Sequence, residues 1–165
     1  MNTASKLSLA LLALTLVGTS VAQAQSANIS ATATVLTPLT LTGTADLAFG
    51  TVFPGIAKTV AAADATSGRF TIAGNPNSQV SMTFTLPANL TGAGSLAIGS
   101  WTGERNTTNT TGGTAFTPSA AAELQTLSGT GNAYLFIGAT VTPTVAQAAG
   151  AYSGTVTLNV VYTGL

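Results

Sequence analysis

The chain has 165 residues, with only four Lys or Arg, four Asp or Glu, a net charge of zero, and neither cysteine nor histidine. Nucleic-acid binding is excluded, because contacts to phosphate need clustered Lys and Arg. The absence of Cys and His also removes the usual nucleophile and base pairs and most transition-metal sites. We therefore predict a protein that is not an enzyme, with no catalytic residue, no metal site and no cofactor.

The first 24 residues have the layout of a secretory signal peptide. Lys6 precedes the apolar run Leu7–Val17, and the small residues of Ala22-Gln23-Ala24 follow. The apolar run is much shorter than the roughly 20 residues that a membrane-spanning helix needs. We predict a signal peptide at residues 1–24, cleavage after Ala24, and a mature single domain, residues 25–165, with no membrane span.

The start of the mature chain has the two-residue period of a β-strand. No charge occurs from Gln25 through Ala45, so this strand is an association hazard if it stays unpaired. Its partner is either another strand of the same chain or the sheet edge of a neighbouring copy, which is called β-strand addition. We interpret residues 25–36 as an N-terminal strand or a donor extension. The residues of its apolar face, a predicted subunit interface, are Ile29, Ala31, Ala33 and Val35.

Two further strands are predicted at residues 69–74 and 79–86, on either side of the sequence Gly74-Asn-Pro-Asn-Ser78. Gly, Pro and Asn supply turn dihedral angles at low strain, so the two strands are expected to form a hairpin. The apolar residues that alternate along the second strand are Val80, Met82, Phe84 and Leu86.

The pattern is less regular in residues 92–131. One strand is indicated there by Leu96, Ile98 and Trp101. Residues 106–113 are polar and without period, which predicts a long exposed loop. Residues 120–127 fit either a strand or one helical turn.

The last third of the chain is regular again. Residues 133–141 predict a buried central strand, residues 143–149 a connection, and residues 152–162 the last strand. The total is about eight to ten short strands separated by turns, which is typical of a β-sandwich. We therefore predict an all-β, immunoglobulin-like antiparallel sandwich.

The acidic residues after the signal occur singly, without the pairing that glycoside hydrolysis needs or the clustering that calcium needs. They are Asp46, Asp64, Glu104 and Glu123. We interpret them as solvated charges, with Glu104 and the adjacent Arg105 forming a surface pair.

Trp101 is the single tryptophan of the chain. It could contact a ligand, as a stacking platform for sugar beside the loop that ends at Gly113. The alternative, packing in the core or at a sheet edge, is the one we favour because no other aromatic residues cluster near it in the sequence.

The C-terminal segment combines a glycine, an alternating apolar strand and a tyrosine near the end of the chain. These residues are Gly150, Val156, Leu158, Val160 and Tyr162. This combination resembles the C-terminal strand of chaperone–usher pilins, and the N-terminal N-I-S-A-T-A-T-V-L-T-P-L resembles the extension of colonisation-factor type fimbrial subunits. The resemblance implies that the five C-terminal residues form an assembly strand, with a periplasmic chaperone and an outer-membrane usher as partners. Tyr162 is followed by three residues, whereas the tyrosine of those pilins is penultimate.

Both ends and the first half of the chain resemble an uncharacterised family of secreted bacterial β proteins, whereas residues 92–131 show no such resemblance. The shared blocks are A-T-A-T-V at residues 31–35, D-L-x-F-G-T-V-x-P-G at 46–55, F-T-I-x-G-x-P at 70–76, and Q-A-A-G-x-Y-x-G-T-V-T-L-x-V-x-Y at 147–162. We therefore expect a structural subunit of a surface filament or fimbria-like assembly that polymerises by β-strand addition of its N-terminal segment. It would cross the periplasm and reach the cell surface. The alternative is a monomeric secreted adhesin or glycan-binding β-sandwich.

Overall fold

The computed structural model describes residues 25–163, so the predicted signal peptide and its cleavage site lie outside the described residues. The chain divides into two units, Met1–Thr34 and Val35–Leu165. In the first unit, residues 25–34 are exposed and form no strand. The strand expected for Asn28–Val35 is therefore not formed, and its alternating side chains have no strand partner within this unit.

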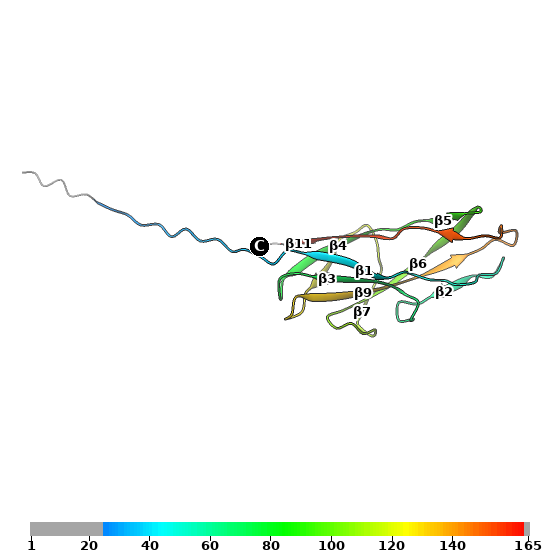
Figure 1. Cartoon of the computed structure of the whole chain (residues 1–165), viewed down its shortest axis with the longest axis horizontal. Helices are drawn as coiled ribbons and strands as arrows, with labels where there is room; N and C mark the ends of the chain where they lie inside the picture. Colours follow the sequence, from blue (N-terminus) through cyan, green and yellow to red (C-terminus); the bar gives the residue numbers. More distant parts are fainter. Residues whose placement is uncertain (1–24, 164–165) are drawn as a thin grey trace, which may run out of the picture. The chain divides into compact units, whose positions relative to one another are not determined.

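The second unit contains eleven β-strands (Figure 1). Residues 25–163 contain no helix, and in particular none long and apolar enough to cross a membrane. The all-β prediction is confirmed, and the count exceeds the expected ten because three strands have only two or three residues. The strands are β1 Thr40–Ala45, β2 Lys58–Val60, β3 Gly68–Ala73, β4 Gln79–Thr85, β5 Asn89–Gly92, β6 Ser95–Asn106, β7 Thr114–Phe116, β8 Glu123–Thr126, β9 Asn132–Thr142, β10 Tyr152–Ser153 and β11 Thr157–Tyr162.

The strands form two antiparallel sheets of unequal size. The larger sheet has the order β1-β3-β9-β6-β5-β10, with β2 also pairing with β9 and β7 with β6. The smaller sheet has the order β11-β4-β8. Every pairing is antiparallel. Strand β9, predicted as the buried central strand, pairs with β3 and β2 along one edge and with β6 along the other.

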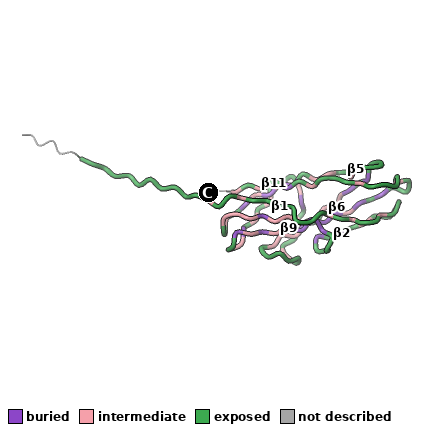
Figure 2. The backbone as a smooth tube through the Cα atoms, in the orientation of Figure 1, coloured by how far each residue is buried: buried purple, intermediate pink, exposed green. Residues whose placement is uncertain are grey.

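The core has two parts, which lie along the length of β9 (Figure 2). The first part lies between the two sheets and consists of Ile72, Val80, Met82, Phe84, Leu127, Ala133, Leu135, Ile137 and Leu158. The second part consists of Leu96, Ile98, Ala139 and Val141, all from β6 and β9. The side chains that pack against this second part come from the 47–52 segment, β5, β6 and β10, and none comes from the smaller sheet. The smaller sheet therefore covers only one half of the larger one.

The predicted hairpin of residues 69–86 is wrong, because β3 belongs to the larger sheet and β4 to the smaller one. The intervening turn bonds to a distant loop: Gly74 N donates to Gly131 O at 2.8 Å, and Asn77 N donates to Ser128 O at 3.0 Å. These bonds hold the turn as an arch between the sheets. Two strands separated by turn residues have the same local pattern in a hairpin and in such an arch.

The structure also tests the predictions for strand β4, for residues 107–127 and for the last strand. The apolar face of β4 is buried as predicted, with Val80 and Met82 fully covered. The segment 120–127 contains a strand, β8, and residues 107–113 form an exposed irregular loop. The single last strand expected at 152–162 is divided into β10 and β11, which belong to different sheets.

Replacing Gly138 by alanine should destabilise the fold. A Cβ atom at Gly138 would lie 2.6 Å from Ala62 N and 2.7 Å from Ala61 C, and backbone atoms cannot rotate away. We expect a loss of about 1–3 kcal/mol in the free energy of unfolding, measured by urea denaturation. Gly99→Ala in the neighbouring strand β6 is the matched control, because its Cβ would meet no atom within 4 Å. Equal losses for the two variants would contradict this packing.

Candidate functional site

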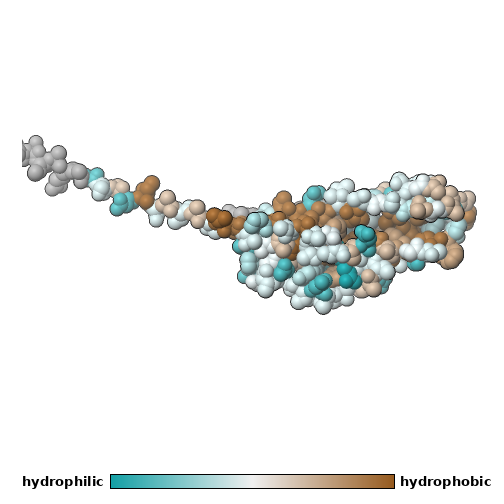
Figure 3. Space-filling model, viewed as in Figure 1, coloured by the Kyte–Doolittle hydropathy of each residue, from teal (hydrophilic) through white to brown (hydrophobic). Residues whose placement is uncertain are grey.

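An apolar groove of about 960 Å³ lies over the half of the larger sheet that the smaller sheet leaves uncovered. One wall is formed by residues between Gly43 and Pro54, and the other by residues 147–156. Figure 3 shows hydrophobic side chains gathered along the body of the second unit. The floor of the groove includes Phe70, Leu96, Ile98, Trp101, Ile137 and Val141.

Trp101 lies in the floor of this groove and is half-buried. It packs against both parts of the core, as the interpretation we favoured for it expects. A β-bulge places it there: the pairing of β6 with β9 shifts between Gly99 and Thr102, and Ser100 has a φ of 48°. A bulge inserts an extra residue and redirects the side chains around it. Sequence periodicity cannot show such a shift, because a bulge breaks the two-residue period.

The first wall includes an open strand edge. Strand β1 pairs with β3 on one side, and residues 35–163 include no strand that pairs with its other side. All six β1 residues are exposed, although Leu41, Gly43 and Ala45 alternate as on a buried face. The wall continues through Leu47, Phe49 and Val52, which pack against the second part of the core. These residues lie in the second shared sequence block, so that block builds one side of the groove.

A side-chain clamp holds the second wall in place. The Gln147 side-chain amide donates hydrogen bonds to Ser95 O at 3.1 Å and to the Tyr152 hydroxyl at 2.7 Å. The Tyr152 hydroxyl donates in turn to Ala148 O at 2.7 Å. Gly150 lies close against Ala93, since a Cβ at position 150 would lie 2.7 Å from the Cβ of Ala93. The block Q-A-A-G-x-Y thus has a structural meaning that the sequence alone did not give: it shapes the groove wall.

Tyr162 lies at one pole of the second unit, beyond the groove lining. Its hydroxyl donates a hydrogen bond to Thr37 O at 2.8 Å and accepts one from Asn75 N at 2.6 Å. Leu39 packs there against the first part of the core, beside Gly74. The lining extends in the other direction to Pro54 and Pro143, in the loops of the opposite pole, so the groove opens toward that pole.

The groove is almost free of charge. Asp46 is the one charged residue in its lining. The other acidic residues lie elsewhere: Asp64 accepts a hydrogen bond from Ala61 N at 2.8 Å, and Glu104 accepts one from Gly112 N at 2.7 Å. In the part of the chain that the structure describes, no group of three or more Asp, Glu, His or Cys residues could hold a metal ion.

The predicted surface pair of Glu104 with Arg105 is wrong. Neighbouring residues of strand β6 point to opposite faces of the sheet. Arg105 instead makes a salt bridge of 3.1 Å with Glu123 on β8 and donates to Leu124 O at 2.9 Å. This ion pair joins the two sheets at a place remote from the groove lining.

The predicted C-terminal assembly residues are divided between the groove wall and the core. Gly150 and Val156 line the second wall. Leu158, Val160 and Tyr162 turn their side chains toward the first part of the core, so the face predicted for this strand is the one that packs inward. The predicted N-terminal interface residues Ile29 and Val35 are each 93% exposed. The Ala residues between them, Ala31 and Ala33, are exposed too.

The variant Tyr162→Phe should weaken the attachment of the last strand to the start of the second unit. It leaves a part-buried backbone N–H at Asn75 without its partner and frees the carbonyl of Thr37. We expect a loss of about 1–3 kcal/mol in the free energy of unfolding, measured in urea. Tyr134→Phe is the control, since no hydrogen bond of the Tyr134 hydroxyl is found within residues 25–163. If Tyr162→Phe is as stable as the control variant, the hydroxyl does not hold the two ends together.

Comparison with known proteins gives a family and no function. No curated protein and no solved structure matches this chain. The family model described as "Domain of unknown function (DUF4402)" matches residues 55–162, which include the second wall of the groove and all strands from β2 to β11, but not the first wall. The match covers more than half of the chain, and the chain therefore belongs to this family of uncharacterised domains.

Proposed function

We propose that this protein is a non-enzymatic structural subunit of a surface filament, in which the N-terminal segment of one copy adds as a β-strand to the groove of the next. The observation that carries the proposal is the incomplete cover of the larger sheet. An apolar groove lies open beside an unpaired strand edge, and the same chain has an uncharged alternating segment without a partner strand.

The chemistry of the segment matches that of the groove. An added strand gains main-chain hydrogen bonds from a sheet edge, and its alternate side chains give specificity through pockets. Strands β1 and β11 each have one edge without a pairing strand in the second unit. The segment's apolar side chains would cover the floor around Trp101, and the lack of charge from Gln25 to Ala45 avoids burying an ion.

The size of the side chains supports the same pairing. Ala31 and Ala33 are small, whereas Ile29 and Val35 at the two ends of the face are larger. Trp101 and Phe70 are the large aromatic residues of the floor, and its other apolar residues are smaller and aliphatic. Small central residues let the added backbone approach the strand edges, while the larger ends bury apolar area at about 25 cal/mol per Å².

Export and assembly partners belong to the same proposal. The subunit would be secreted through the periplasm to the cell surface. A periplasmic chaperone would protect the free edge of β11 until another copy occupies the groove, and an outer-membrane usher would receive the complex. An exposed edge of this kind needs protection, because an unpaired strand edge promotes uncontrolled association.

Trp101 allows a direct test. A variant that lacks residues 25–35 should remain folded and monomeric, and a synthetic peptide of residues 25–36 should bind it and change the fluorescence of Trp101. We expect one peptide to bind per protein and to shift the emission to shorter wavelength, because the peptide removes water from the groove floor. A peptide with Ala31→Asp is the matched control, and burying its carboxylate should abolish binding.

Electron microscopy of the full mature chain completes this test. We expect filaments or detergent-resistant ladders, and their loss in the variant without residues 25–35. Filaments that persist in the truncated variant, or a full-length protein that stays monomeric at high concentration, would overturn the proposal. A monomer that instead binds glycans would favour the secreted adhesin.

A further inference from the structure

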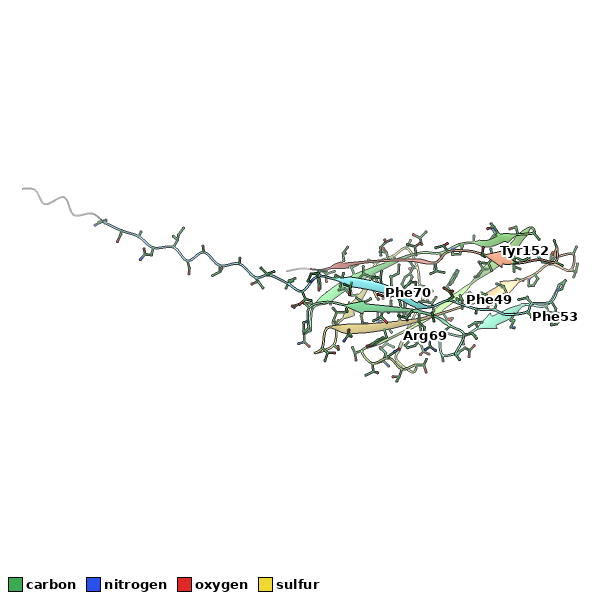
Figure 4. All side chains as sticks on the ribbon, in the orientation of Figure 1. Phe49, Phe53, Arg69, Phe70 and Tyr152 are labelled. Carbon is green, nitrogen blue, oxygen red and sulfur yellow. The ribbon has the colours of Figure 1, made fainter. Side chains whose placement is uncertain are left out.

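A second exposed apolar surface lies at the pole toward which the groove opens. We call it the pole patch, and it consists of Phe53, Ile56 and Val145, which are 63%, 61% and 88% exposed. Figure 4 places Phe53 at one end of the body, with Phe49 and Tyr152 further in along it. The groove lining reaches Pro54 and Pro143, next to the patch residues in the chain. The pole patch therefore borders the mouth of the groove.

The pole patch is held in place by the backbone. Ile56 N donates a hydrogen bond to Phe53 O at 3.1 Å, which closes a turn, and Gly55 has a φ of 74°. Gly55 N donates to Thr144 O at 3.0 Å and so joins this turn to the loop of Val145. Three large apolar side chains are thus presented to solvent from two connected turns. Exposed apolar groups gathered in this way mark an interaction site more often than scattered ones do.

The direction of an added strand decides which end of the added segment lies at the pole patch. The opposite pole holds Tyr162, which bonds to Thr37 O, and β11 runs from Thr157 toward that pole. An added strand that pairs with the free edge of β11, antiparallel as β4 does on its other edge, runs from the Tyr162 pole to the open one and lies parallel to β1. The Val35 end of an added segment would therefore lie at the open pole.

The chain leaves little room between the added segment and the body that follows it. Only residues 36–39 separate Val35 from strand β1. Four residues span at most about 14 Å when fully extended. The body of the incoming copy must then lie against the open pole of the first copy, because the connection is too short to hold it away.

We infer that the pole patch of one copy is the docking surface for the body of the next copy, at the end where residues 36–39 enter β1. This inference rests on the proposed function and adds to it: the groove would supply the strand contact, and the patch would fix the angle between successive bodies. The occupant is a second copy of this chain, because the strand connection brings that copy's own apolar Leu36 and Pro38 to the patch.

The absence of cysteine makes the contact testable by cross-linking. Two single variants of the full mature chain are mixed, one with Phe53→Cys and the other with Pro38→Cys, and are treated with a short bifunctional maleimide. We expect a cross-linked dimer that joins the two kinds of subunit. Leu124→Cys mixed with Pro38→Cys is the matched control, since Leu124 is 50% exposed on β8, outside the groove lining and the pole patch. Equal cross-linking at positions 53 and 124 would overturn the inference.

Two further variants distinguish a failure of this inference from a failure of the proposed function. Removing residues 25–35 from the Pro38→Cys copy should abolish the cross-link. Adding Ile56→Ser and Val145→Ser to the Phe53→Cys copy should slow the cross-link roughly tenfold, the factor that corresponds to about 1.4 kcal/mol of lost apolar contact. Detergent-resistant ladders should persist in that copy. Ladders without any cross-link at position 53 would reject the patch and keep the strand addition, whereas the absence of ladders in the unmodified chain would reject the strand addition itself.

Discussion

The structure depends on one mismatch of size: a three-stranded sheet packs against an eight-stranded one. A β-sheet with an apolar face must bury that face against another layer. The smaller sheet does this for Ile72, Leu135 and Ile137, but it does not extend over Ile98 and Val141. That second half of the core is covered at its sides by an irregular segment and by β10. The groove between them is a direct result of the missing cover.

Both walls of the groove combine a short paired strand, β1 or β10, with irregular chain. The first wall is largely irregular chain, anchored by Leu47, Phe49 and Val52. The second is held by the hydrogen bonds of Gln147 and Tyr152. Such walls can keep their positions while leaving main-chain groups available to another strand. The model of the family to which the chain belongs matches most of this architecture, including the glutamine, glycine and tyrosine of the clamp.

The sequence predicted the fold class and the strongly periodic strands, because burial of one face imposes a two-residue period that is visible in the residues themselves. Strands β4, β9 and β11 are of this kind. It did not predict the partner of each strand: the Gly74–Ser78 turn is an arch, and nothing local distinguishes it from a hairpin. The position of Trp101 in the groove floor could not be predicted from the sequence either, since it depends on a bulge at Ser100. The groove itself arises from tertiary contacts between residues about a hundred positions apart.

The link between Tyr162 and Thr37 has a mechanical meaning. It ties the beginning of the second unit to its last strand, at the point where residues 25–35 join the body. A pull transmitted through that segment reaches strand β1 at Thr40. The component of this force along β1 is shared at once by the five positions that pair β1 with β3, instead of opening them one after another. A body attached in this way is suited to withstand tension along a chain of subunits.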